Sequence, residues 1–206
     1  MLAIAALAIT SITVTVLAAN RPATLSLLEL GPDWRERWSE KRFDSTPTRY
    51  IELEENGERA LMASSVDSAS ALWLPIETML SERMELSWRW KVTRGLSNQT
   101  EREKSGDDYA ARVFVSFGAD PFSKGSHSLC YVWASEEPVG SVYTSPYSSN
   151  VVTIVLKSGK DRVGEWASEK RDVVEDYHRA FGALPRTIHA IAMMVDTDNT
   201  RSRATA

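Results

Sequence analysis

The sequence MELSWRWKV, residues 84–92, alternates apolar and polar side chains without interruption. Its apolar side chains share one face: Met84, Leu86, Trp88, Trp90 and Val92. A period of two residues is typical of a β-strand that buries one face and exposes the other. This stretch therefore predicts a strand whose tryptophans belong to a hydrophobic core.

Other short apolar runs, separated by turn residues, extend this pattern along the chain. Asn56–Gly57 separates two such runs within residues 49–64, and Asn-Gly is the strongest short signal for a β-hairpin. Further strands are predicted within residues 70–76, 109–117, 128–134, 151–157 and 187–196. Many short strands with turns between them favour a sandwich over a parallel sheet.

One segment departs from the strand pattern. Val173, Tyr177 and Phe181 recur at helical spacing. Asp172 precedes them as a candidate N-cap, and Gly182 follows as a candidate helix end. We therefore predict an all-β fold, an antiparallel β-sandwich of the jelly-roll type with one short helix late in the chain.

The composition is that of an ordinary globular domain, with 206 residues, 43% hydrophobic and 25% charged, and a net charge of −4. Acidic and basic residues are interspersed and no basic stripe occurs, which argues against a nucleic-acid partner. Cys130 is the only cysteine, so no disulfide can form within the chain. Its apolar neighbours predict a small buried side chain. We expect residues 20–206 to form a single domain.

Residues 1–19 are largely apolar and carry no charged side chain. They predict an export signal cleaved near Ala19, and therefore a periplasmic or secreted protein. An uncleaved membrane anchor is the next alternative, although its hydroxyl-bearing residues would make a weak span. A buried first strand is the least favoured alternative. Contact with a membrane is expected only if this segment stays uncleaved.

Residues 104–117, KSGDDYAARVFVSF, place a charged segment directly before a predicted strand. Arg112 falls on the face of that strand opposite the aliphatic side chains, as Arg89 and Lys91 do in residues 84–92. If both strands belong to one sheet, its second face gathers cations, and an outer or concave face is where a sandwich binds ligands. The pattern predicts a site for an anionic or hydroxyl-rich ligand. An ordinary solvated strand face is the alternative.

Asp107 and Asp108 precede this strand. Adjacent residues of an extended segment point in opposite directions, so the two carboxylates cannot easily face one substrate. Aspartate after glycine is common in turns, where it accepts hydrogen bonds from backbone amides. We expect one of the two to hold the loop or to pair with Arg112, with metal or substrate contact as the alternative.

A second acidic cluster, Asp196, Asp198 and Asn199, follows the last predicted strand. Its oxygens suit calcium. Thr200 and Arg201, however, stand where a calcium loop would have a further oxygen ligand and a glycine. A turn is the preferred interpretation. Calcium is the one cofactor considered, and none is required.

Side chains that could act on a sugar are also present. An exposed tryptophan can stack on a sugar ring, and Trp133 is a candidate. Candidate carboxylates for glycoside hydrolysis are Asp107, Asp108, Asp196, Glu175 and Asp176. None of the three histidines has a cysteine, serine or histidine partner at a suggestive spacing, so zinc and triad chemistry have no support.

Five segments together resemble a family of exported bacterial proteins that carry a domain of unknown function, number 3047 in that series: LSWRWKV, SGDDYAARVFVSF, CYVWA, EKRDVVEDYHRAFG and IAMMVDTDNT. The resemblance extends from Trp38 to the end of the chain and implies a concanavalin-like jelly roll. It implies no catalytic residues. Family members continue through one more strand after residues 196–200, and alternation begins again at residues 201–206, so the domain is expected to lack its final strand.

These observations favour a lectin-like module that binds a glycan or another polyhydroxyl ligand. The predicted ligand-binding residues are Arg112, Asp107, Asp108, Lys91, Trp133, Asp196 and Asp198. A protein-interaction domain of the cell envelope is the first alternative. A glycoside hydrolase or polysaccharide lyase on the same scaffold is the second.

Overall fold

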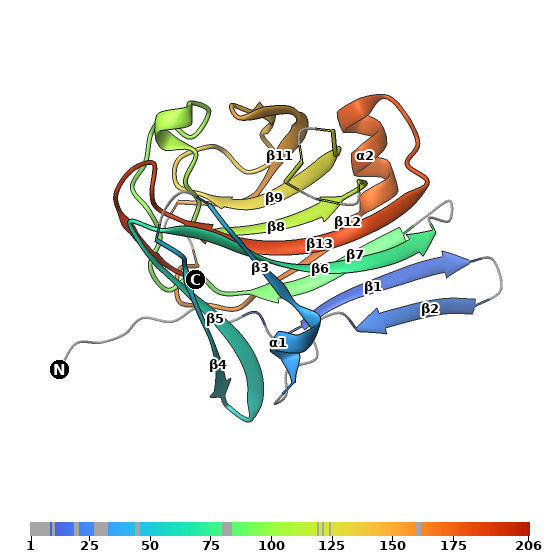
Figure 1. The fold of residues 1–206 in the computed structure, drawn as a ribbon, viewed down its shortest axis with the longest axis horizontal. Helices are drawn as coiled ribbons and strands as arrows, with labels where there is room; N and C mark the ends of the chain where they lie inside the picture. Colours follow the sequence, from blue (N-terminus) through green and yellow to red (C-terminus); the bar gives the residue numbers. More distant parts are fainter. Residues whose placement is uncertain are drawn as a thin grey trace.

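A computed structural model of the chain shows two main β-sheets, with a smaller third sheet beside them (Figure 1). It describes residues 9, 11–18, 21–26, 33–43, 46–79, 84–118, 120, 122–123, 125–159 and 162–206. Within these ranges no helix has the length and apolar character needed to cross a membrane.

The larger sheet has seven strands in the order β10-β11-β9-β8-β13-β6-β3. Their bounds are β3 Ser39–Arg42, β6 Ala69–Met79, β8 Ala111–Ser116, β9 Ser128–Ala134, β10 Val142–Ser145, β11 Ser148–Ser158 and β13 Thr187–Asp196. Neighbouring strands are antiparallel except β9 and β11, which run parallel. The predicted all-β sandwich is confirmed. Its one parallel pair could not be predicted, because side chains alternate with the same period in both kinds of pairing.

The second sheet has the order β12-β7-β1-β2. Its strands are β1 Ser11–Ala18, β2 Arg21–Ser26, β7 Met84–Trp90 and β12 Ala167–Asp172. Residues 11–18 of the segment predicted as an export signal or anchor therefore lie in β1, which pairs antiparallel with β7. This is the least favoured of the three sequence alternatives. Residues 1–8, 10, 19 and 20 lie outside the described residues, and export stays a prediction.

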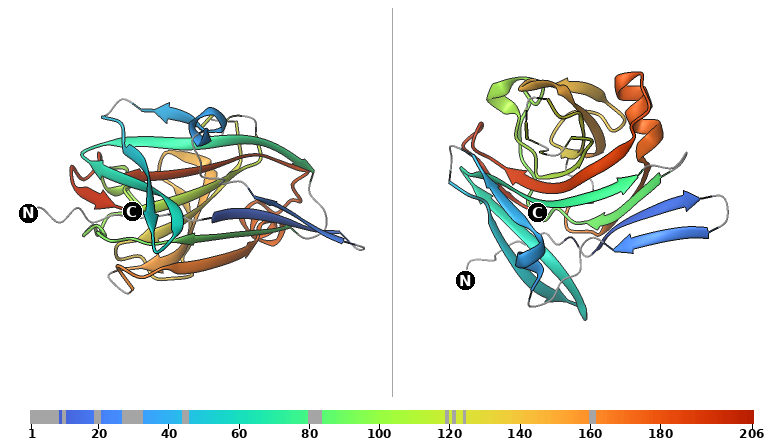
Figure 2. Two further views of the ribbon diagram at one scale, coloured as in Figure 1. Left: turned by 90° about the horizontal axis from the view of Figure 1, so that it is seen from below. Right: turned by 45° about the vertical axis from the view of Figure 1, so that its right-hand side comes forward.

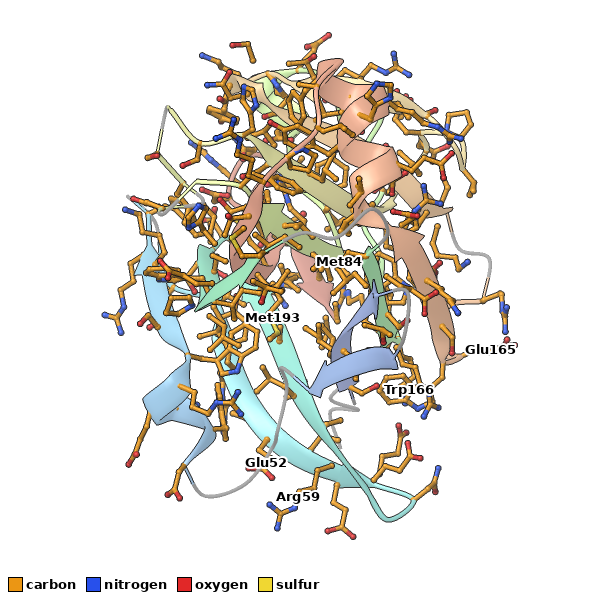
Figure 3. All side chains as sticks on the ribbon, turned by 90° about the vertical axis from the view of Figure 1, so that its right-hand side faces the viewer. Glu52, Arg59, Met84, Glu165, Trp166 and Met193 are labelled. Carbon is orange, nitrogen blue, oxygen red and sulfur yellow. The ribbon has the colours of Figure 1, made fainter. Side chains whose placement is uncertain are left out.

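The third sheet contains the predicted hairpin. Its order is β14-β5-β4, with β4 Arg49–Glu55, β5 Glu58–Val66 and β14 Arg203–Thr205. Asn56 and Gly57 form the turn with φ of 54° and 82°, the left-handed conformation that a two-residue hairpin turn requires. Glu52 and Arg59 form an ion pair of 3.2 Å across the hairpin (Figure 3). The renewed alternation near the end of the sequence corresponds to β14, and a missing final strand stays a prediction.

A hydrophobic core fills the space between the two main sheets. Met84 of β7 and Met193 of β13 both belong to it (Figure 3). Trp88 and Trp90 are 1% and 0% exposed, as the alternation predicts, and the Trp90 ring lies 5.9 Å from that of Trp133 on β9. Large aromatic side chains of both sheets therefore hold the sandwich together.

The predicted late helix is α2, Val173–Phe181. The Asp172 side chain accepts hydrogen bonds from the backbone amides of Val174 and Glu175, at 3.1 and 3.2 Å, which caps the helix N-terminus. Gly182 ends the helix with a left-handed φ of 67°. A second short helix, α1 (Trp34–Arg37), precedes β3, and its first residue is buried.

The seven-stranded sheet curves, and its concave face is turned away from the four-stranded sheet (Figures 1 and 2). On β8, Val113 and Val115 enter the core between the sheets, whereas Phe114 belongs to a separate apolar cluster on the other face. Arg112 shares the face of Phe114 by alternation. The predicted gathering of cations required β7 and β8 to belong to one sheet, but they lie in different sheets. Arg89 and Lys91 therefore do not share a face with Arg112.

Candidate functional site

A cleft of about 390 Å³ lies on the concave face of the seven-stranded sheet. Strands β6, β8, β10, β11 and β13 supply side chains to it, and loops and turns supply the rest. Its aromatic lining residues are Phe43, Phe114, Phe122 and Tyr147. Its charged lining residues are Asp107, Arg112, Asp196 and Asp198. Four of the seven predicted ligand-binding residues therefore converge in one concave site.

Arg112 organises the charged part of the cleft and is only 6% exposed. Its Nε donates to Asp196 Oδ1 at 2.9 Å, and its Nη2 donates to Asp196 Oδ2. Its Nη1 donates to Asp107 Oδ1 at 3.5 Å, and Nη2 also donates to the Asp107 carbonyl. The guanidinium carbon lies 4.3 Å from the centre of the Tyr109 ring. One buried cation thus fixes two carboxylates that are far apart in the sequence.

Asp107 follows the short 3-10 helix η1, Lys104–Gly106. A Cβ on Gly106 would lie 2.5 Å from the carbonyl oxygen of Thr100, so this close approach requires glycine just before Asp107. Asp107 is 5% exposed, and within the described chain its carboxylate bonds only to Arg112, through Oδ1. Its Oδ2 accepts no hydrogen bond from the described residues, and Asp107 lines the cleft, where a ligand could donate to this oxygen.

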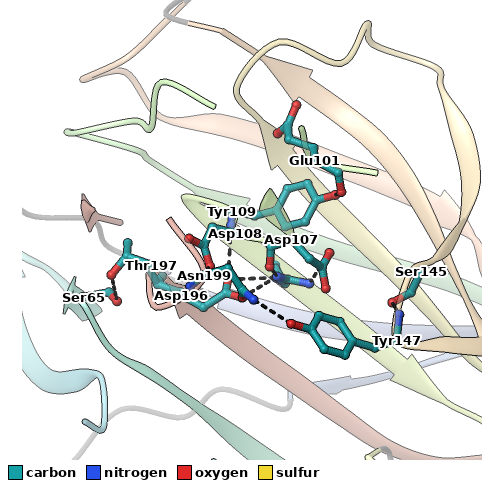
Figure 4. A network of polar contacts seen from close by, with 12 residues as sticks. Ser65, Glu101, Asp107, Asp108, Tyr109, Ser145, Tyr147, Asp196, Thr197 and Asn199 are labelled. Atoms are coloured by element: carbon teal, nitrogen blue, oxygen red, sulfur yellow. Dashed lines mark hydrogen bonds and ion pairs between the residues drawn. The ribbon is translucent and has the colours of Figure 1, made fainter. Parts of the chain in front are cut away.

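Asp108 has a different role and does not line the cleft. It is 0% exposed and accepts hydrogen bonds from the backbone amides of Asn199 and Thr200, at 3.2 and 2.6 Å, and from the Thr200 hydroxyl at 2.5 Å. These bonds hold the turn that carries Asp198 and Asn199 into the cleft (Figure 4). One aspartate was expected to hold the loop or to pair with Arg112, and the structure shows both contacts: Asp108 holds a turn and Asp107 pairs with Arg112.

The turn between β10 and β11 forms one wall of the cleft. The Tyr147 hydroxyl accepts a hydrogen bond from Asn199 Nδ2 at 2.6 Å and donates to the Lys104 carbonyl at 3.2 Å. Asn199 Nδ2 also donates to that carbonyl at 2.7 Å. Tyr147 therefore joins three loops at the rim (Figure 4).

Thr153 is the least expected polar group in the cleft. It lies in the middle of β11, is 1% exposed, and shares the concave face with Val151 and Val155. No side-chain hydrogen bond joins its hydroxyl to any residue that the structure describes, and Thr153 lines the cleft. A buried hydroxyl without a hydrogen-bond partner lowers the stability of the folded protein by about 1–3 kcal/mol. Its position suits a contact with a molecule bound in the cleft.

Three phenylalanines form a continuous aromatic group. The Phe122 ring lies 5.5 Å from that of Phe43 and 5.9 Å from that of Phe114, both in edge-to-face geometry. Phe43 and Phe122 are partly exposed, whereas Phe114 is 7% exposed. The outer rings can therefore contact a ligand while Phe114 supports them from the sheet.

Burial changes the acid–base behaviour of this site. It raises the pKa of Asp196 from 3.8 to about 7, although the charge of Arg112 acts in the opposite direction. Burial also raises the pKa of Asp107, and the charge of Arg112 again acts to lower it. Burial alone would lower the pKa of Arg112, but the two carboxylates raise it well above its ordinary value. Arg112 therefore stays charged, while the carboxylates can exchange protons.

Two predicted ligand-binding residues lie elsewhere. Lys91 is 7% exposed, contacts Glu55 at 2.6 Å and lies 5.0 Å from the Trp166 ring centre. Trp133 is 1% exposed in the core between the sheets, where its Nε1 donates to the Gly159 carbonyl at 3.3 Å. Placing them in the cleft was wrong, because Trp133 belongs to the core between the sheets and Lys91 follows β7, a strand of the other sheet.

The other candidate carboxylates are also separate from the cleft. Glu175 is exposed on α2 and pairs with Arg179. Asp176 is buried and binds the Tyr131 hydroxyl at 2.8 Å and Arg171. Neither lines the cleft, so within the part of the chain that the structure describes the carboxylates of the cleft are Asp107, Asp196 and Asp198.

Two of the predicted calcium ligands, Asp196 and Asp198, lie beside Asp108, which was not predicted as one, and the third, Asn199, lies in the turn that Asp108 holds. Asp108, Asp196 and Asp198 each offer an oxygen, and these oxygens lie within 4.8 Å of one another. Both oxygens of Asp108 already accept hydrogen bonds from the 199–200 turn, and both oxygens of Asp196 accept from Arg112. A cation would compete with these donors, so the donor set fits calcium poorly. Calcium binding stays a prediction.

Several cleft residues could not be identified from the sequence. Phe43, Phe122 and Tyr147 lie in loops or turns, whose positions relative to the sheet are not encoded in a local pattern. Thr153 carried a usable signal, since it interrupts an apolar strand at a position shared with Val151. A polar residue at an otherwise apolar strand position is a reason to look for a partner.

Comparison with known proteins agrees with the resemblance noted above. The profile of DUF3047, described as a protein of unknown function, matches residues 36–206. The chain therefore belongs to the DUF3047 family. No curated protein matches it.

Proposed function

We propose that this chain binds a glycan or a similar polyhydroxyl ligand in the concave cleft. The observation that carries the proposal is the meeting of aromatic rings with ordered polar groups in one cleft of about 390 Å³. A sugar ring offers both an apolar C–H face and hydroxyl groups, which suits such a lining. The predicted export, if it occurs, would bring the chain to glycans of the periplasm or the cell surface.

The residues divide the binding task between them. Phe122 and Phe43 supply partly exposed rings for stacking. Asp107 Oδ2 and the Thr153 hydroxyl supply hydrogen-bonding oxygens. Arg112 holds Asp107 in place before a ligand arrives, which reduces the ordering cost of binding.

Thr153→Val is the sharpest test, because it removes only the hydroxyl and keeps the side-chain shape. Glycan arrays would first supply a ligand, and calorimetry would then measure its affinity for each variant. We expect Thr153→Val to fold as the wild type does and to bind about tenfold more weakly, the loss of one hydrogen bond.

The matched control is Thr78→Val on β6, whose residue lies outside the cleft lining and should keep wild-type affinity. Phe122→Ala should also weaken binding, and Phe122→Tyr should preserve it. No binding to any glycan would overturn the proposal. In that case, capture of an envelope protein that is lost in Phe122→Ala would favour the protein-interaction alternative.

A second candidate function is cleavage of the bound glycan by hydrolysis or by a lyase reaction. One observation favours it: Asp107 and Asp196, both with raised pKa values, lie in the same cleft. Release of new reducing ends from the bound glycan would reveal this activity. Asp107→Asn should abolish cleavage while the ligand still binds, and an absence of cleavage with intact binding would leave a binding module.

A further inference from the structure

We propose that the ligand is a basic sugar, an oligosaccharide that carries free amino groups, and that the cleft discriminates against uronates. This inference rests on the proposed function and specifies its ligand class. It departs from the anionic ligand that the cations of the sequence predict, because the structure separates Lys91 and Arg89 from Arg112.

The charge of the cleft supports a basic ligand. Among the residues described as lining it, Arg112 is the only cation, against three carboxylates: Asp107, Asp196 and Asp198. Arg112 directs Nε, Nη1 and Nη2 at Asp107 and Asp196. Its guanidinium is therefore committed to the protein's own carboxylates, and a ligand carboxylate would have to compete with Asp107 and Asp196 for it.

Two other cations that the structure describes near the site are held by their own contacts. Lys104 lies over the Tyr147 ring, 5.4 Å from its centre, at the rim. Arg102 forms two hydrogen bonds with Glu137, at 2.8 and 2.6 Å. Asp108, buried behind the turn, adds a further negative charge close to Asp196 and Asp198.

An ammonium group would find two kinds of partner in the cleft. Asp107 is 5% exposed and presents Oδ2 without a protein donor from the described residues. The rings of Phe122 and Phe43 offer negatively polarised faces that attract cations. Thr153 can bond a neighbouring hydroxyl or amino group through its unpartnered oxygen. A carboxylate and aromatic faces together favour an amine over a neutral or acidic substituent.

The test compares three tetrasaccharides of one length with different charges: glucosamine, N-acetylglucosamine and galacturonic acid. Calorimetry with the full chain, near neutral pH and at low salt, would give the three affinities. We expect the glucosamine oligomer to bind at least about tenfold more tightly than its acetylated form, and the galacturonate to bind most weakly. Added salt should reduce this preference, because it screens the charges.

Variants test whether these carboxylates are the cause. Asp107→Asn and Asp198→Asn should each remove most of the preference for the amino sugar, because each weakens binding of the glucosamine oligomer far more than binding of the acetylated one. Glu54→Gln on β4 removes the same charge from an exposed position outside the cleft lining, so it should keep the preference. Circular dichroism and thermal melting confirm that each variant is folded.

The outcomes separate this inference from the function on which it rests. Equal affinity for the three sugars, or tighter binding of the galacturonate, would overturn the inference and leave glycan binding in place. A preference that persists in both Asp107→Asn and Asp198→Asn would also overturn it. Failure of every sugar to bind would overturn the proposed function, and the inference with it.

Discussion

The two faces of the seven-stranded sheet are built from the same strands, but one face packs in the core and the other lines the cleft. The inner face packs against the second sheet, and its tryptophan, Trp133, is 1% exposed. The concave face has its own small apolar cluster, but it also carries Arg112, Thr153 and Asp196. Alternation sends successive residues to opposite sides, so one strand such as β8 can serve both faces. Substitutions on the two faces can therefore separate the stability of the core from the ligand binding proposed for the cleft.

The largest expected effect is on the inner face. Trp133→Ala should lower the free energy of unfolding by about 3–5 kcal/mol, because it leaves a large cavity between the sheets. Phe122→Ala, on the partly exposed side of the cleft, should cost about 1 kcal/mol. Urea denaturation measures both. Equal losses for the two variants would contradict the division between the faces.

Arg112→Met should have the next largest effect, because it leaves Asp107 and Asp196 buried without a cation. We expect a loss of about 3 kcal/mol above neutral pH. The loss should shrink in mildly acidic buffer, because both carboxyls have raised pKa values and can become neutral. Arg179→Met, on the exposed surface of α2, is the control and should cost less than about 0.5 kcal/mol. A loss independent of pH would show that Arg112 acts through packing alone.

Asp196 should make stability depend on pH in a specific direction. Its pKa is about 7 in the folded chain, above its ordinary 3.8, so the folded state holds an extra proton between these values. The free energy of unfolding should therefore fall as pH rises from about 4 to about 7. Melting temperatures across this range should show a shallower fall in Asp196→Asn. An unchanged slope in that variant would assign the effect to other groups.

Calcium should have the smallest effect. The oxygens of Asp108 and Asp196 already accept hydrogen bonds, so a cation would have to displace these donors. We expect millimolar calcium to leave the melting temperature unchanged. A clear rise that is lost in Asp198→Asn would contradict this expectation and establish a metal site on the concave side.

Local patterns predicted the strands well but not the arrangement of the sheets. The alternation in residues 84–92 and 109–117, the Asn56–Gly57 turn and the Asp172 cap all correspond to observed elements. These features depend on neighbours in the sequence. Which strands share a sheet depends on pairing between distant segments, so the separation of β7 from β8 could not be predicted.

The candidate site was predicted in part for the same reason. Arg112, Asp107, Asp196 and Asp198 were identifiable because charged residues beside or within an apolar strand are unusual. Trp133 was misassigned, because alternation identifies two faces without saying which one is covered. Phe43, Phe122 and Tyr147 were missed because they lie in loops or turns. The course of these segments depends on tertiary contacts such as the Tyr147–Asn199 hydrogen bond.

The position of β13 has a consequence for how the chain acquires its structure. This strand lies between β6 and β8, yet it comes from residues 187–196 and follows both by a long interval in the sequence. During synthesis, β6 and β8 would emerge with unsatisfied edges well before their shared neighbour exists. The seven-stranded sheet therefore closes late, and the nascent protein has a prolonged period in which it can aggregate or recruit a chaperone.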